Sequence, residues 1–132
     1  MKAVVHILRN AAGVTTLLNG GGNAIYVGHA VQDQEPPYIT VESSVIDNYL
    51  RKDSGRDLIK ESYDVFIYSR SYGESKAIAA AVESALDFVT PGTYNGQVVS
   101  SGRLVAEESQ STIEENIHYW LITQRYELML NA

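Results

Sequence analysis

The sequence predicts an α+β domain with a mostly antiparallel sheet and helices packed chiefly on one face. Three observations lead to this class. A helical pattern opens the chain, segments rich in β-branched and aromatic residues follow it, and an amphipathic helix interrupts those segments. The expected order of elements is α-α-β-β-β-α-β-β, and a single domain is expected to span residues 1–132.

The first part of the chain is expected to be helical and then extended. Residues 2–18 fit a helix, a bend at Asn10–Gly13 and a short second helix. The glycines that follow, Gly20–Gly22, can adopt the left-handed conformation in which helices commonly end. Strands are expected at 24–28 and 38–46, where apolar residues alternate with polar ones.

The segment from Val45 to Arg56 combines basic residues with large apolar residues and ends in a turn signal. We expect a long hairpin, with strands before Asp47 and after Arg56, whose tip projects from the core as an arm. Two interpretations stay open: the apolar residues fold back onto the domain, or the arm packs on another subunit. The candidate interface residues are Val45, Ile46, Tyr49, Leu50, Arg51, Lys52 and Arg56.

The centre of the chain reads as a strand, a tight turn and a helix between Asp57 and Val89. The strand pattern of 62–69 gives way to apolar residues with helical spacing from Ile78 onward. Ser71 and Glu74 fit a capping box, in which the hydroxyl of Ser71 accepts from the amide of Glu74 and the carboxylate reaches back to the amide of Ser71.

The C-terminal part is expected to consist of two loops and two strands. A Gly- and Ser-rich loop at 90–102 leads to a short strand at 103–106, and an acidic, solvated loop follows at 107–115. The last strand, 117–130, is apolar in both of its alternating sets at the start, which is typical of the middle of a sheet.

Composition limits the possible chemistry. Hydrophobic residues make up 45% of the chain, enough for one globular domain, and the absence of cysteine excludes disulfides, thiolate metal sites and a cysteine nucleophile. The N-terminal apolar run is too short for a secretory signal and no stretch approaches a membrane span, so we expect a soluble intracellular protein without a membrane partner.

The chain is acidic, with 16 acidic and 10 basic residues and a formal charge of −6. A surface that grips nucleic-acid phosphates is normally basic, so tight DNA binding is disfavoured. A surface that DNA slides past is compatible with this charge, although ordinary solubility charge is the simpler explanation for any single acid.

Few residues suggest catalysis. The three histidines, His6, His29 and His118, lack metal-ligand spacing. We therefore assign no catalytic, cofactor-binding or metal-binding residue and expect no cofactor. A remote enzyme hypothesis stays open: a small hydrolase that uses His29 or His118 with Glu107 or Glu108, provided that these side chains converge in one pocket.

The order of elements, together with two local motifs, resembles the tail-completion (tail-terminator) proteins of long-tailed bacteriophages and prophages. One motif is the Pro-Tyr-Ile-x-Val strand at Pro37–Val41. The other is the Ser-Tyr-x-Glu helix start at Ser71–Glu74, which is followed by Ile78, Val82 and Leu86. The resemblance covers nearly the whole chain, and the segment Val45–Arg56 departs from it.

This resemblance implies a structural, non-enzymatic subunit of the virion tail. Such a subunit forms a ring, commonly a hexamer, that caps the tail tube and joins it to the head connector, and DNA passes through the ring without specific binding. The implied partners are copies of the subunit itself, the tail tube protein and head–tail connector proteins. During assembly the subunit would lie in the host cytoplasm. The alternative within the same class is a head–tail connector or stopper subunit.

Overall fold

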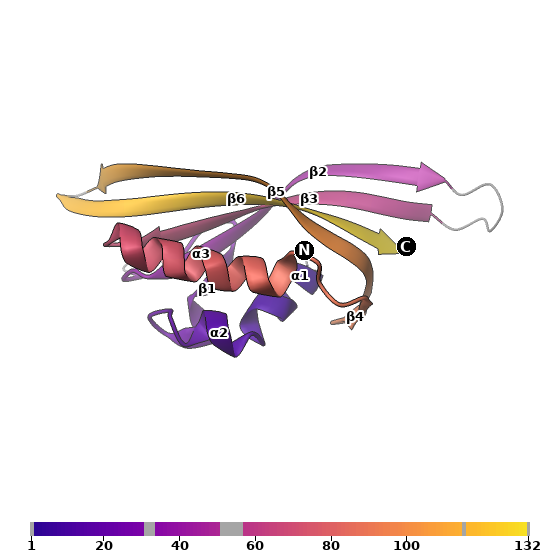
Figure 1. Ribbon diagram of the computed structural model, residues 1–132, viewed down its shortest axis with the longest axis horizontal. Coiled ribbons are helices and arrows are strands. Elements are labelled where there is room, and N and C mark those ends of the chain that lie inside the picture. The colour runs from indigo at the N-terminus through magenta and orange to yellow at the C-terminus, as the bar shows by residue number, and fades with distance from the viewer. Residues whose placement is uncertain (1, 31–33, 51–56, 115, 132) are drawn as a thin grey trace.

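The computed structural model describes residues 2–30, 34–50, 57–114 and 116–131, without the side chains at 2, 44–50, 57–58, 114, 117 and 131. The helices lie on the same side of a sheet whose strands run in the order β1-β2-β3-β6-β5-β4 (Figure 1). The elements are α1 (Lys2–Arg9), α2 (Ala12–Thr15), the 3₁₀ helix η1 (Gly21–Ala24), β1 (Ile25–Val27), β2 (Tyr38–Leu50), β3 (Asp57–Ser69), α3 (Tyr72–Leu86), β4 (Gly92–Tyr94), β5 (Gln97–Glu114) and β6 (Ile117–Asn131).

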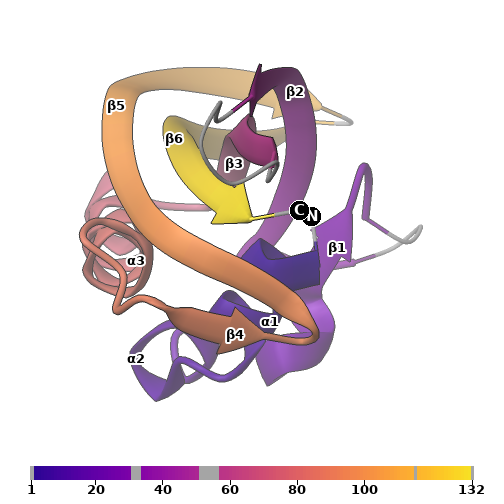
Figure 2. The same cartoon turned by 90° about the vertical axis from the view of Figure 1, so that its right-hand side faces the viewer.

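The predicted combination of helices with a mostly antiparallel sheet is confirmed. Only the short β1 runs parallel to its neighbour, β2, among the described strands. The sheet contains β4, which the predicted order lacked. Figure 2 shows that β5 curves round, so that its first residues and β4 lie beside α1. The amide of Ala3 in α1 donates to Gln97 Oε1 there, at 3.1 Å.

Two long hairpins extend from the body of the protein in opposite directions (Figure 1). The first, the β2–β3 arm, runs from Glu42 outward, and the second, the β5–β6 arm, runs from Ala106 outward. The register places both starting points at the same level, because Glu42 lies opposite Asp64, Asp64 opposite Arg125, and Arg125 opposite Ala106. The predicted arm at 45–56 is thus a hairpin as far as residues 50 and 57; residues 51–56 lie outside the described residues.

The prediction of an acidic loop at 107–115 is wrong. Residues 107–114 belong to β5 and pair with β6 from Gln124 to Ile117. The predicted loop at 90–102 also contains β4 and the start of β5. Ser, Gln and Glu have weak intrinsic strand preference, but pairing with a strongly β-forming neighbour overrides it, and polar side chains suit an edge strand with one solvated face.

One core joins the helices to the inner face of the sheet. Its residues are buried because strands contribute every second side chain and α1 and α3 each contribute one helical stripe. The fully or almost fully buried members include Val4, Leu8, Ile39, Val41, Tyr63, Val65, Ile67, Ile78, Val82, Leu86, Ile122, Tyr126, Leu128 and Leu130.

The start of α3 confirms half of the predicted capping box. Ser71 Oγ accepts from the amide of Glu74 at 3.1 Å. The amide of Ser71, however, donates to Ser69 Oγ rather than to the Glu74 carboxylate. Ser69 and Ser75 are fully buried with their hydroxyls 2.6 Å apart, and Ser75 also donates to the carbonyl of Trp120. These bonds fix α3 to both β3 and β6, which leaves the Glu74 side chain at the exposed surface.

Substitution of Gly102 tests how closely α3 packs on β5. A Cβ at this position would lie 2.6 Å from the carbonyl oxygen of Leu86, at the end of α3. We expect Gly102→Ala to lower the free energy of unfolding by about 1–3 kcal/mol, because backbone must move to admit the methyl group. Gly73→Ala is the control, since Gly73 lies in α3, the helix against which Gly102 packs, and has open space around it. Urea denaturation of both variants provides the measurement, and equal stability would contradict the close packing.

Candidate functional site

The sheet has a face that no described helix covers, opposite the core, which we call the open face. In the middle of this face the side chains form three rows across the four long strands, as the register shows. Listed from β2 through β3 and β6 to β5, the rows are Tyr38, Tyr68, Leu121 and Gln110; Thr40, Phe66, Thr123 and Glu108; and Glu42, Asp64, Arg125 and Ala106.

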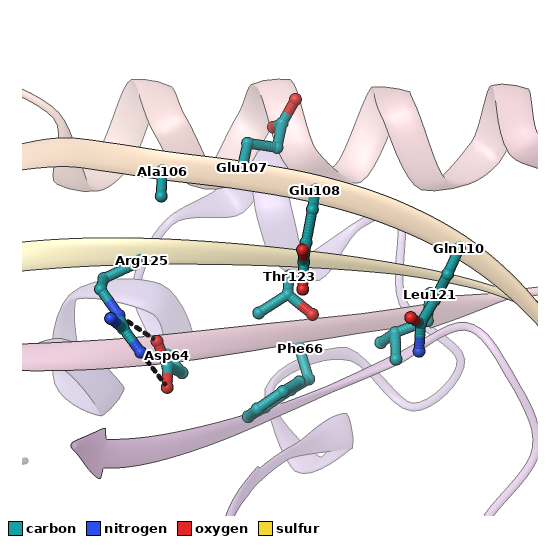
Figure 3. A pocket seen from close by; sticks show the side chains of 9 residues that line it. All are labelled: Asp64, Phe66, Ala106, Glu107, Glu108, Gln110, Leu121, Thr123 and Arg125. Carbon is teal, nitrogen blue, oxygen red and sulfur yellow. Dashed lines mark hydrogen bonds and ion pairs between the residues drawn. The ribbon is translucent and has the colours of Figure 1, made fainter.

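Ion pairs between neighbouring strands engage two basic side chains of the open face, Arg125 in its middle and Lys60 on the β2–β3 arm. Arg125 forms a bidentate ion pair with Asp64, with Nε 2.9 Å from Oδ1 and Nη2 3.3 Å from Oδ2 (Figure 3). The Lys60 ammonium lies 3.2 Å from Glu127. A further acid, Glu108, is exposed and has no ion-pair partner among the described residues. The free charge in this part of the face is therefore negative.

A shallow hollow of about 450 Å³ lies on this face between β3 and β5 (Figure 3). Phe66 and Leu121 supply apolar surface, and Thr123 and Gln110 supply polar groups. Beside it, the rings of Tyr38 and Tyr68 stack with centroids 4.7 Å apart. Stacked and β-branched side chains on adjacent strands stiffen a sheet, so this face presents a rigid surface.

A buried hydrogen-bond network fixes the opposite face of the sheet to α3. Gln124 is fully buried, and its Nε2 donates to the carbonyl of Ala79 at 3.1 Å and to Glu107 Oε1 at 2.8 Å. Its Oε1 accepts from the Tyr126 hydroxyl at 2.8 Å. Burial raises the pKa of Tyr126 far above its usual range, which keeps this hydroxyl protonated as a donor.

Glu107 links this network to the surface of α3. Its Oε2 lies 3.1 Å from Lys76 Nζ. The hydrogen bond from Gln124 lowers the pKa of the Glu107 carboxyl, and the hydrogen bond and charge of Lys76 lower it further against the opposing effect of partial burial. Glu107 is thus held ionised between strand and helix, which indicates a structural role.

The residues of the hydrolase hypothesis do not converge. Glu108 lines the hollow on the open face, the Glu107 carboxylate lies on the opposite face between Gln124 and Lys76, and His29 lines a different hollow beside Tyr38. His118 pairs with Ile113, six positions along β5 from Glu107, which corresponds to roughly 20 Å of strand. Among the described residues no group of three or more acidic, histidine or cysteine side chains could hold a metal ion. No described helix is long and apolar enough to cross a membrane.

Four of the seven candidate interface residues fall on the β2–β3 arm. The structure places Val45, Ile46, Tyr49 and Leu50 in β2, opposite β3, but describes only their backbone. Arg51, Lys52 and Arg56 lie outside the described residues. The prediction of this interface is therefore neither confirmed nor contradicted by the fold.

Sequence reasoning missed the open face as a surface. The alternation of Leu121, Thr123 and Arg125 along β6 is a signal of such a surface, but the β5 residues that face them have the polar composition of a loop. Without β5 as a strand, the rows could not be assembled.

Comparison with known proteins gives two matches. A family model described as "Tail completion protein gp17" matches residues 2–127. A solved structure, "Virion of native gene transfer agent (GTA) particle", contains a chain with a similar fold, at a TM-score of 0.70 and 17% sequence identity, over 98% of this chain and 92% of that chain. No curated protein sequence matches.

The Glu107 contact makes a pH-dependent contribution to stability. Its folded pKa lies below the unfolded value, so the contribution is fully present above the unfolded pKa and disappears as pH falls through the folded one. We expect Glu107→Gln to lower the free energy of unfolding at pH 7 by about 1 kcal/mol and to weaken its dependence on acid pH.

Glu108→Gln is the matched control for this prediction, because Glu108 is the next residue along β5 and is exposed without an ion-pair partner among the described side chains. Denaturant titrations between pH 3 and pH 7 compare the two variants with the native chain. Identical pH profiles for both variants would show that the Glu107 contact contributes nothing.

Proposed function

The chain belongs to the tail completion protein gp17 family of phage structural proteins, and on this premise we propose that it is the subunit of a ring that completes the tail. The ring, commonly a hexamer in tail-completion proteins, caps the tail tube and joins it to the head connector. Its partners are copies of itself, the tail tube protein and connector proteins, and it acts in the virion after assembly in the host cytoplasm. Membership of the family across residues 2–127 is the observation that carries this proposal.

The shape of the subunit supports assembly into a ring. The two arms extend in opposite directions from one body, so each copy offers two different ends to its neighbours (Figure 1). Contacts between unlike surfaces of identical subunits close into a ring when the rotation divides the circle. We assign to this contact Val45, Ile46, Tyr49 and Leu50 of the β2–β3 arm, together with Arg51, Lys52 and Arg56, which lie outside the described residues.

The open face suits the lining of a channel through which DNA passes. Helices cover the other face, so the open face is the one that can turn toward the axis without filling the hole. Lys60 and Arg125 are engaged by acids, whereas Glu108 is free among the described residues. Phosphates therefore meet no free cation among the described side chains in the middle of this surface, which favours passage over binding.

Assembly and its dependence on the arm can be measured together. We expect the purified chain to form a closed oligomer, alone or on tail tubes, by native mass spectrometry and negative-stain microscopy. Replacing both Tyr49 and Leu50 by Ser should weaken assembly at least tenfold while the thermal midpoint changes little, because both positions lie on the projecting hairpin. A chain that remains monomeric and does not bind tail tubes would contradict the proposal. Capture of portal-side proteins alone would indicate the connector or stopper alternative.

The channel assignment is tested by reversing one charge. Glu108→Lys should give assembled rings that retain DNA in a salt-dependent manner, whereas native rings should not. Glu83→Lys, on α3, makes the same change in net charge away from the open face. Filter binding of duplex DNA to both assembled variants is the measurement. Equal retention by the two would show that the open face does not meet DNA.

A further inference from the structure

We propose that neighbouring copies join edge to edge, with β5 of one subunit pairing as an antiparallel strand with β2 of the next. The inference rests on the proposed ring and deepens it by naming the two surfaces that meet. It makes the sheet continuous from one subunit to the next.

Each arm carries one strand whose outer edge is unpaired within the described structure. β1 pairs with β2 only at Ile39–Val41, so the outer edge of β2 is open over 42–50. β4 pairs with β5 only at Gln97–Val99. The turn after α3 then occupies the next backbone groups of β5, and no described strand pairs with its outer edge over 105–114.

The backbone contacts of that turn identify the outer edge of β5, which is the edge that faces away from β6. The carbonyl of Gly102 accepts from the amide of Phe88 at 2.8 Å, and the amide of Leu104 donates to Asp87 Oδ1 at 2.9 Å. These groups point away from β6. Beyond Leu104, the same edge of the strand is left without a partner among the described residues, and β5 still runs on to Glu114.

Neither open edge carries a proline or a lysine, which are strong protections of an edge strand, although both contain acids and one register shift at the inner end. Exposed edge strands are normally interrupted by proline or by lysine, or kept short. The segments 42–50 and 105–114 contain no proline, lysine or arginine, and each has its single register shift near its inner end. Apolar side chains are also exposed along β5, with Ile113 at 71% and Val105 at 47%. Long edges that are regular beyond the inner bulge and free of proline and lysine can serve as templates for another strand.

Strand direction favours this pairing. β2, β3, β6 and β5 alternate in direction across the sheet, so β5 runs opposite to β2. Rotation about an axis along the strands preserves strand direction. The β2 of the next copy therefore meets β5 in antiparallel orientation, which is the same geometry as within each arm.

The two open edges are offset from each other along the strands, and this offset is compatible with closure of the joined sheets into a ring. From the level shared by Glu42 and Ala106, the open edge of β2 runs toward one end of the molecule and most of the open edge of β5 runs toward the other. Pairing them requires each copy to be displaced along the strands relative to the last. A sheet closes into a barrel only with such a fixed shift in register and with tilted strands, at about 35–45°.

Engineered cysteines test the pairing, because the chain contains none of its own. Full overlap of 42–50 with 105–113 places Ile46 opposite Ser109, and directly opposite Cα atoms in antiparallel strands lie about 4.5–5.5 Å apart, within reach of a disulfide. We expect the Ile46→Cys/Ser109→Cys chain, oxidised with copper phenanthroline, to give a ladder of covalent oligomers on a non-reducing gel. The Ile46→Cys/Ser111→Cys chain reports a register shifted by two residues.

Ile46→Cys/Ser84→Cys is the control, since Ser84 is exposed on α3 away from both edges. It should give no ladder beyond dimers, as should each single variant. Native mass spectrometry of the reduced variants shows whether they assemble, and thermal denaturation shows whether they fold. A reduced chain that assembles but gives no ladder with either β5 partner overturns edge pairing and leaves the ring standing. A folded chain that neither assembles, alone or with tail tubes, nor forms a ladder contradicts both proposals.

Discussion

The antiparallel ladder between β3 and β6 is the contact on which the rest of this structure depends. It pairs Leu58–Ser69 with Trp120–Asn131, two segments separated by the whole of α3, β4 and β5. Each arm is a local hairpin, and among the described strands this ladder alone joins the two arms into one sheet. The same ladder aligns the Arg125–Asp64 pair on the open face and the buried side chains on the other. Loss of its register by one residue would exchange those two faces.

Much of this architecture could be predicted from periodicity. Helix α3 could be predicted from the spacing of Ile78, Val82 and Leu86 and from the Ser71 cap, because those signals are local. The placement of β6 in the interior followed from its apolar start. The strand character of 107–114 could not be predicted, because its residues are polar and the pairing that orders them comes from a partner strand later in the chain. The closing half of the capping box failed because the buried hydroxyl of Ser69, two residues before Ser71, accepts from the amide of Ser71.

The open face was harder to predict than the fold. A family resemblance identified the class of protein, but no residue of the open face carries a catalytic or ligand-binding signature of its own. Its character arises from rows that cross four strands, so it exists only once the register is known. The Gln124 network is equally invisible in the sequence, where an isolated glutamine gives no sign that it will be buried and bonded to α3, β5 and Tyr126.

The position of β6 has a consequence for how the chain folds. β6 is the last strand in sequence, yet it lies between β3 and β5 in the sheet. The β2–β3 hairpin can form early from neighbouring residues. The other edge of β3 stays unpaired until β6 is available, because their paired residues are more than fifty positions apart, as in the pairing of Ser69 with Trp120. Such distant closure is slow compared with local structure formation. A nascent chain therefore passes through a stage with bare interior strands, in which intermolecular association competes with completion of the monomer.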